Sequence, residues 1–168
     1  MKISKKIALV GLCAATAIAA GYFERFIPIS FGVPGIKLGL ANVAVLFALY
    51  ALDTRSAFGI SLVRILVGGV AFGGVYGLLY SLAGGLLSFG GMAITKQTNR
   101  FSPIGVSMLG GVLHNWGQIA IAAFVVRNIG ILRLSPILTL AGMAAGALTG
   151  LAATMVLHGL AHNGVVSK

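Results

Sequence analysis

The chain alternates between long apolar runs and short segments that hold all of its prolines and nearly all of its charged residues. A helix needs about 20 predominantly apolar residues to cross a membrane, and several of these runs approach that length. We expect helices over residues 7–23, 38–52, 57–70, 75–94, 103–126 and 135–157. The pattern predicts an all-α fold, a compact bundle of about six transmembrane helices that forms a single domain over residues 1–168.

The connections between the runs carry signals that break or start helices. Residues 24–37 contain two prolines and two glycines, which excludes a continuous helix and predicts a structured loop or a re-entrant segment. Residues 68–74 contain two Gly-Gly pairs, and we expect a turn there. Ser102 with Pro103, and Ser135 with Pro136, are typical helix starts.

The N-terminal segment has two interpretations. Three lysines precede the first apolar run, a pattern that also occurs in secretory signal peptides. Because the rest of the chain is itself apolar enough for a membrane, we interpret this segment as the first transmembrane helix. Cleavage of the segment stays open.

Composition supports a membrane protein. The chain is 58% hydrophobic and 8% charged, with a mean hydropathy of +1.04, whereas a soluble domain has about 25% charged residues. With about six spans, 168 residues leave no room for a soluble domain. Any machinery that couples energy to transport must therefore be another chain.

The net charge of +10 does not indicate nucleic-acid binding, because the basic residues lie singly or in short clusters at the ends of apolar runs.

Six spans place both termini on one side of the membrane. Seven basic residues lie on that side, and four lie on the other side. Basic residues are enriched in cytoplasmic loops. We therefore expect a multi-pass protein of the cell membrane with both termini in the cytoplasm.

Glycine is abundant, with 25 residues, most of them inside the apolar runs. Small residues spaced four apart let membrane helices approach closely. Three such rows occur: Gly142, Gly146 and Gly150; Gly69, Gly73 and Gly77; and Gly11, Ala15 and Ala19. Each row could pack within the bundle or dock a second membrane protein.

Arg64 lies near the middle of a predicted membrane helix, where a charge costs a few kcal/mol and normally faces a cavity, a partner or a ligand. The alternative is an ion pair inside the protein. Glu24 and Asp53 are the only acidic residues of the chain, and we expect both near a membrane boundary.

A second polar cluster lies midway along the fifth predicted helix. Ser107, His114 and Gln118 share one helical face, and Asn115 lies beside it. These residues could hydrogen-bond between helices, or they could bind a polar or anionic solute.

Lys37 and Asn42 flank the start of the second predicted helix. Backbone N–H groups at a helix N-terminus, together with a lysine, can bind an anion; the alternative is that Lys37 extends to the membrane interface. We predict a substrate-binding site composed of Glu24, Lys37, Asn42, Arg64, His114, Asn115 and Gln118.

Several chemistries are absent from the sequence. Cys13 is the only cysteine, which excludes an internal disulfide and a cysteine-based metal site. No Gly-Lys dipeptide occurs, so the chain has no phosphate-binding loop of the G-x-x-x-x-G-K-[ST] kind. We expect no metal, no cofactor and no catalytic residues.

Four segments resemble a known family: YFERFIP (residues 22–28), PGIKLGLAN (residues 34–42), SLAGGLLSFGGM (residues 81–92) and GGVLHNWGQIAIA (residues 110–122). They resemble the Gx transporters, a family often labelled heptaprenyl diphosphate synthase component I. That family is similar to the substrate-binding S-components of energy-coupling-factor transporters. The resemblance implies a six-helix bundle that captures a solute from outside and works with a transmembrane coupling subunit and two ATPases. It also implies that Gly11, Ala15 and Ala19 contact the coupling subunit.

The predicted function is therefore uptake of a small, anionic and partly hydrophobic solute, such as an isoprenoid phosphate or a quinone or vitamin precursor. The family label offers an enzyme as an alternative, but prenyl transfer requires magnesium on clustered carboxylates, and the chain has two acidic residues. A noncatalytic partner of a prenyl diphosphate synthase remains an alternative. A channel would need a continuous polar lining, and the polar residues are too few for one.

Overall fold

The computed structural model describes residues 3–26 and 39–162, which contain six α-helices and no strand. The helices are α1 (Ile3–Phe23), α2 (Leu40–Ala51), α3 (Thr54–Gly68), α4 (Gly74–Gln97), α5 (Pro103–Val126) and α6 (Ser135–His162). Three short helical segments join them: η1 (Glu24–Phe26), η2 (Gly69–Gly73) and η3 (Ile129–Leu134). The all-α prediction is confirmed.

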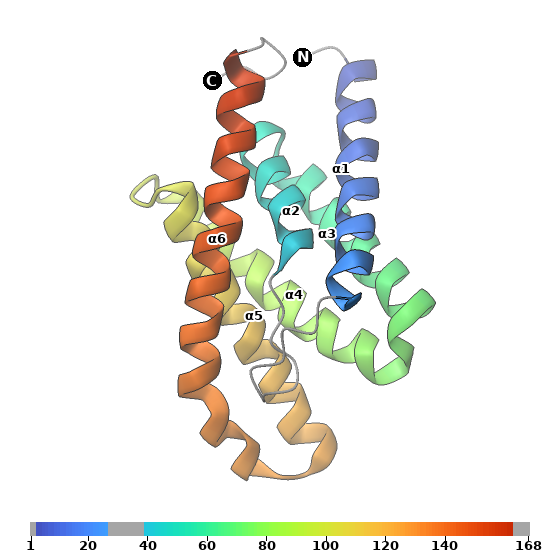
Figure 1. Cartoon of the computed structure of the whole chain (residues 1–168), viewed down its shortest axis with the longest axis vertical. Coiled ribbons are helices and arrows are strands. Elements are labelled where there is room, and N and C mark those ends of the chain that lie inside the picture. Colours follow the sequence, from blue (N-terminus) through green and yellow to red (C-terminus); the bar gives the residue numbers. More distant parts are fainter. Residues whose placement is uncertain (1–2, 27–38, 163–168) are drawn as a thin grey trace.

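The helices run back and forth between two ends of an elongated bundle (Figure 1). The start of α1, the end of α6 and the α2–α3 and α4–α5 connections lie toward one end, whereas η2 and η3 lie toward the other. The short helix α2, with 12 residues, reaches only part of the way through the bundle. A cavity described below lies at its N-terminal end.

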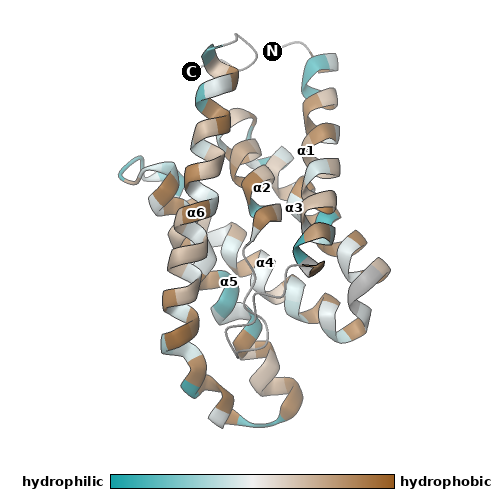
Figure 2. Cartoon of the chain, in the orientation of Figure 1, coloured by the Kyte–Doolittle hydropathy of each residue, from teal (hydrophilic) through white to brown (hydrophobic). Residues whose placement is uncertain are grey.

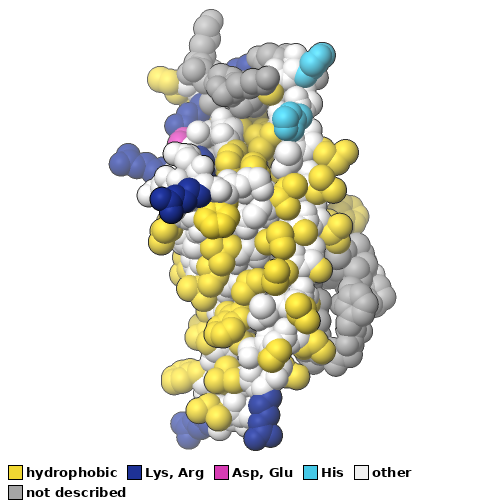
Figure 3. Space-filling view, turned by 90° about the vertical axis from the view of Figure 1, so that its left-hand side faces the viewer, with side chains coloured by type: hydrophobic (Ala, Val, Ile, Leu, Met, Phe, Trp, Pro, Cys, Tyr) yellow, Lys and Arg dark blue, Asp and Glu magenta, His cyan; other side chains and the backbone are white. Residues whose placement is uncertain are grey.

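The exterior is that of a membrane protein. Five of the described helices are long and apolar enough to cross a membrane, and α2 is a shorter apolar helix. Apolar residues run along most of every helix (Figure 2). On one face, hydrophobic side chains cover the middle while lysine and arginine side chains gather toward the two ends (Figure 3). The prediction of a multi-pass membrane bundle is confirmed.

The predicted helices agree with the observed ones apart from shifts of up to four residues at several ends and two further differences. Residues 68–74 do not form a turn throughout, because α3 continues through the π-helical segment η2 and the chain turns at Gly74, where φ is 61°. Glycine pairs weaken a helix without preventing it. The last helix extends to His162 rather than residue 157 because no proline or glycine pair interrupts it. Most of the predicted loop over residues 24–37 lies outside the described residues.

The α2–α3 turn is fixed by Asp53. Its carboxylate accepts hydrogen bonds from the Ser56 backbone N–H (2.9 Å) and the Ser56 hydroxyl (2.8 Å), which caps α3. Lys6 of α1 forms an ion pair with the same carboxylate at 2.8 Å. The Lys6 hydrogen bond, followed by the two from Ser56, holds the Asp53 pKa well below its usual range. One side chain thus joins α1 to the start of α3.

Glycine brings α4, α5 and α6 into direct backbone contact. A Cβ atom at Gly142 would lie 2.7 Å from the Gly111 carbonyl oxygen, and one at Gly146 would lie 2.5 Å from the Ser107 carbonyl oxygen. On the other side of α5, a Cβ at Gly117 would lie 2.7 Å from the Ala83 carbonyl oxygen. The predicted row on the last helix therefore packs within the bundle.

The apolar core is centred on α2. Leu46, Ala48 and Leu49 are fully buried, and Val45 is nearly so. Helices α1, α3 and α6 surround these residues, so α2 is held firmly despite its length. A helix anchored in this way gives its N-terminal end a fixed position beside the site.

Candidate functional site

A cavity of about 160 Å³ lies inside the bundle, and all six described α-helices contribute to its wall. The polar groups come from residues far apart in the sequence. They include Glu24, Asn42, Arg64, Ser81, Ser107, His114, Asn115 and Thr149. Glycines on α3, α4, α5 and α6 complete the lining.

Arg64 is the main charged group of the cavity. Its Nη2 donates a hydrogen bond to the Asn42 side-chain oxygen at 2.7 Å, which joins α3 to the first turn of α2. Its Nε is buried and has no hydrogen-bond partner among the described residues. A buried donor without a partner costs about 1–3 kcal/mol. Arg64 therefore offers a donor for an acceptor inside the cavity.

Glu24 lies in the same cavity rather than apart from Arg64. Its carboxylate accepts a hydrogen bond from the backbone N–H of Gly39 at the start of α2. Gly39 adopts a φ of 76°, which glycine tolerates. The negative charge of Glu24 also attracts the Arg64 guanidinium. Glu24 and Arg64, which we placed together in the predicted site, thus line the same cavity.

The N-terminus of α2 has a carboxylate beside it already. We predicted an anion at this helix end with Lys37 as its partner, and Glu24 now supplies that negative charge. Lys37 lies outside the described residues. Asn42, which we predicted near this helix start, lies in the cavity wall, and so does Glu24.

His114 and Gln118 form a pair one turn apart on α5. The His114 Nε2 and Gln118 Nε2 atoms are 3.2 Å apart, within hydrogen-bond distance. Gly84 of α4 packs against this pair, since a Cβ there would lie 2.7 Å from the His114 carbonyl oxygen and 2.9 Å from the Gln118 Cγ. His114 lines the polar cavity, but Gln118 lines a neighbouring one.

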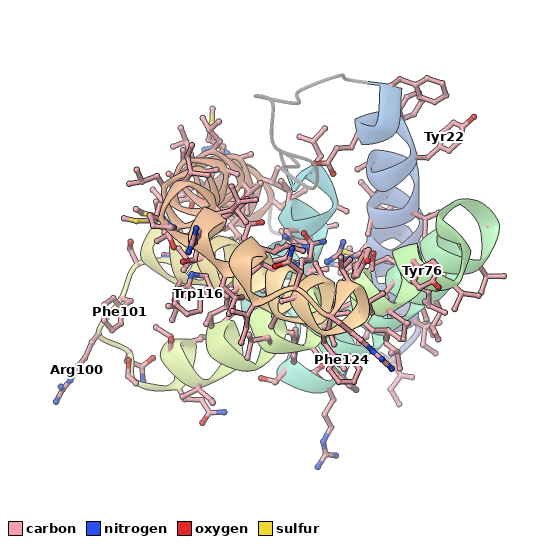
Figure 4. All side chains as sticks on the ribbon, turned by 90° about the horizontal axis from the view of Figure 1, so that it is seen from below. Tyr22, Tyr76, Arg100, Phe101, Trp116 and Phe124 are labelled. Carbon is pink, nitrogen blue, oxygen red and sulfur yellow. The ribbon has the colours of Figure 1, made fainter. Side chains whose placement is uncertain are left out.

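The other polar residues of α5 are used between helices. The buried Asn115 amide donates to the Leu138 carbonyl oxygen of α6 at 2.7 Å, and the Ser107 and Thr149 hydroxyls are 2.9 Å apart. Trp116 donates to Thr139 at 2.9 Å, and it lies on the outside of the bundle, as Phe124 does (Figure 4). We left open whether the polar residues of this helix bond to other helices or bind a solute, and these groups form hydrogen bonds between helices.

A second cavity of about 420 Å³ adjoins the first. Both are lined by Gly77, Ser81 and Asn115. The remaining wall of the second cavity consists of Tyr80, Gln118, Ile119, Ala122, Ile131, Leu134 and Leu138. We did not predict this cavity, or Thr149 and Ser81 in the first, because single hydroxyls and apolar residues in apolar helices carry no signal of their own.

The small-residue row of α1 faces outward. Gly11, Ala15 and Ala19 are exposed, and a Cβ at Gly11 would meet nothing within 4 Å. The opposite face of α1 buries Cys13 and Ala17 in the core. Unlike the row on α6, the row on α1 therefore has no packing role among the described residues.

No group of three histidine, cysteine or acidic side chains in residues 3–26 and 39–162 could hold a metal ion.

The family model described as heptaprenyl diphosphate synthase component I matches residues 13–156, so the chain belongs to that family. No curated protein and no solved structure matches the chain.

Proposed function

We propose that this member of the heptaprenyl diphosphate synthase component I family is the solute-binding membrane subunit of an uptake system. In this proposal it resembles an S-component and catalyses no reaction. The observation that carries the proposal is Arg64, a partly buried cation within a candidate membrane span, whose Nε is buried and has no hydrogen-bond partner among the described residues. Such groups in membrane helices normally serve a ligand or a pathway.

The solute that fits is small, anionic and partly hydrophobic, such as an isoprenoid phosphate or a quinone or vitamin precursor. Arg64 supplies a permanent positive charge, and Asn42 and His114 lie in the same wall. The Glu24 carboxylate already accepts a hydrogen bond from the Gly39 N–H, so part of its hydrogen-bonding capacity is used inside the protein. Lys37 belongs to the proposed site by sequence alone.

Energy would come from separate subunits. The proposal includes a transmembrane coupling subunit and two ATPases, because the sequence contains no nucleotide-binding loop. The exposed row Gly11, Ala15 and Ala19 is the proposed contact with the coupling subunit, since small residues allow close helix approach. Both termini are proposed to be cytoplasmic.

The proposal is tested first by mass spectrometry of small molecules retained by the purified protein, with Arg64→Gln as the comparison. We expect an anionic molecule on the wild-type protein that is depleted from the variant. Proteoliposomes that contain only this chain should bind this solute without concentrating it. Uphill uptake driven by a proton or sodium gradient in such vesicles would contradict the dependence on a partner.

The second candidate function is that of a noncatalytic membrane partner of a prenyl diphosphate synthase. The family description, which names a synthase component, favours it. Copurification with a synthase subunit, together with synthase activity that depends on this chain, would support this candidate. Retention of a solute by the chain alone, with no synthase in the membrane complex, would support uptake instead.

A further inference from the structure

We propose that the second cavity holds the apolar chain of the same solute whose anionic head lies at Arg64. The ligand class is then a single-chain amphiphilic anion, and Ala122 is a residue that determines the accepted chain length. This inference rests on the proposed function, because it assumes that the polar cavity binds a solute. Beyond the proposed function, the inference places the remainder of the solute in the second cavity and assigns it an apolar character.

The two cavities adjoin each other along α4 and α5. Gly77, Ser81 and Asn115 line both of them. The Asn115 amide is held by the Leu138 carbonyl oxygen at 2.7 Å, so it forms a fixed part of the wall. A Cβ at Gly77 would meet nothing within 4 Å, so no other side chain fills the space directly in front of this shared residue.

The volumes indicate that the polar cavity alone is too small for an organic solute. It measures about 160 Å³, whereas small-molecule sites typically measure about 300–1,000 Å³. The adjoining cavity measures about 420 Å³ and falls within that range. A molecule that places only its head at Arg64 therefore has its remaining volume in the second cavity.

The chemistry of the second cavity suits a hydrocarbon chain and excludes a second charged group. Its described lining contains no lysine, arginine, aspartate or glutamate. Five side chains are aliphatic: Ile119, Ala122, Ile131, Leu134 and Leu138. Gln118 is within hydrogen-bond distance of His114. A buried charge without a partner would be costly there, but a chain of methylene groups would not.

The far end of the second cavity is formed by η3. Ile131 and Leu134 lie in this segment, and Leu134 is 41% exposed. The cavity thus opens to the outside of the protein beside η3. Because Ala122 lines this cavity, narrowing it there should penalise long chains and spare short ones.

The experiment compares butyl phosphate and dodecyl phosphate as probes, with native mass spectrometry of the protein in phosphatidylcholine nanodiscs. The main variant is Ala122→Trp, and the matched control is Ala120→Trp, an exposed position on the same helix that lines neither cavity. For each probe the affinity ratio of wild type to variant is measured, so that partition of the probe into lipid cancels.

We expect Ala122→Trp to weaken dodecyl phosphate at least tenfold and to change butyl phosphate less than twofold, while Ala120→Trp changes neither. Gly77→Leu at the junction is a second variant if Ala122→Trp does not fold, and it should show the same selectivity. Arg64→Gln should weaken both probes. Equal effects of Ala122→Trp on both probes, or no effect, would overturn the inference while leaving the proposed function standing.

Other outcomes separate the two proposals. If Arg64→Gln binds both probes as the wild type does, the proposed anion site is wrong. If Ala122→Trp still weakens dodecyl phosphate more than butyl phosphate in that case, the result would support only the chain cavity. A phosphatidylcholine molecule retained equally by wild type and Arg64→Gln, and lost in Ala122→Trp, would assign the cavity to bilayer lipid and overturn the inference. Failure of both probes to bind the wild type would overturn both proposals.

Discussion

The Arg64 guanidinium donates a 2.7 Å hydrogen bond from Nη2 to the side-chain oxygen of Asn42. This bond links the middle of α3 to the first turn of α2, across 22 residues of sequence. It holds one side of the guanidinium in place and leaves the buried Nε available. An arginine prepared in this way can bind an acceptor without a large loss of side-chain freedom.

Replacing Arg64 by glutamine should weaken solute binding by about 1.5–3 kcal/mol, the range for hydrogen bonds to charged groups. His114→Ala should act in the same direction but less, because a neutral histidine contributes a hydrogen bond and no charge. The control is Arg100→Gln, on an exposed arginine of the α4–α5 connection. Wild-type affinity in Arg64→Gln, or loss of the fold, would show that the arginine is structural.

Gly146→Ala should destabilise the bundle by about 1–3 kcal/mol, the usual effect of overpacking. The added Cβ would lie 2.5 Å from the Ser107 carbonyl oxygen and 2.6 Å from the Met108 Cα, where only backbone movement can make room. The matched control is Gly90→Ala, because a Cβ at Gly90 meets nothing within 4 Å. Thermal unfolding in detergent measures both, and equal melting temperatures would contradict the close α5–α6 contact.

Gly11→Leu and Ala15→Leu should prevent association with the coupling subunit and leave solute binding unchanged. Bulk on a small-residue row separates helices that pack through it, and this row is exposed in the isolated chain. Thr16→Leu adds similar bulk at an exposed position beside the row and serves as the control. Copurification is the measurement, and normal recovery of the partner with both variants would remove this face from the proposal.

Asp53→Ala should lower stability at pH 7 by about 1 kcal/mol, the typical effect of losing a helix N-cap. Because the Asp53 pKa is lowered in the folded protein, its contribution is complete above the unfolded pKa of about 3.9. The contribution is lost as pH falls below that value toward the folded pKa. The difference in melting temperature between wild type and variant should therefore be constant from pH 7 down to about pH 4 and shrink as the pH is lowered further. A difference that does not shrink below about pH 4 would mean that the ionised carboxylate contributes nothing.

The orientation is tested with single cysteines in a Cys13→Ala background. Thr98 in the α4–α5 connection and Asn128 before η3 are both exposed and lie at opposite ends of the bundle (Figure 1). We expect a membrane-impermeant thiol reagent to label Asn128→Cys from outside and Thr98→Cys only after the membrane is opened. The reverse pattern would place the termini outside.

The sequence by itself determined that this chain is an all-α, multi-pass membrane protein. Apolar runs of sufficient length, interrupted by prolines and charges, leave no other way to satisfy backbone hydrogen bonds in lipid. The bounds of α5 were predicted to the residue, because Ser102 with Pro103 starts this helix and Arg127 ends its apolar run. Arg64 also stood out, since a charge at membrane depth is rare.

Only the tertiary structure decided which polar residues share a site. Helical spacing places Ser107, His114 and Gln118 on one face, but it does not say that Ser107 meets Thr149 or that Asn115 meets Leu138. Glu24 and Gly39 are brought together across 15 residues of sequence. The first cavity is lined by glycines from four helices, and their spacing along the sequence does not reveal that they meet around one space. Cavities and long-range contacts depend on how helices pack, and periodicity along one helix contains no information about the neighbour it will meet.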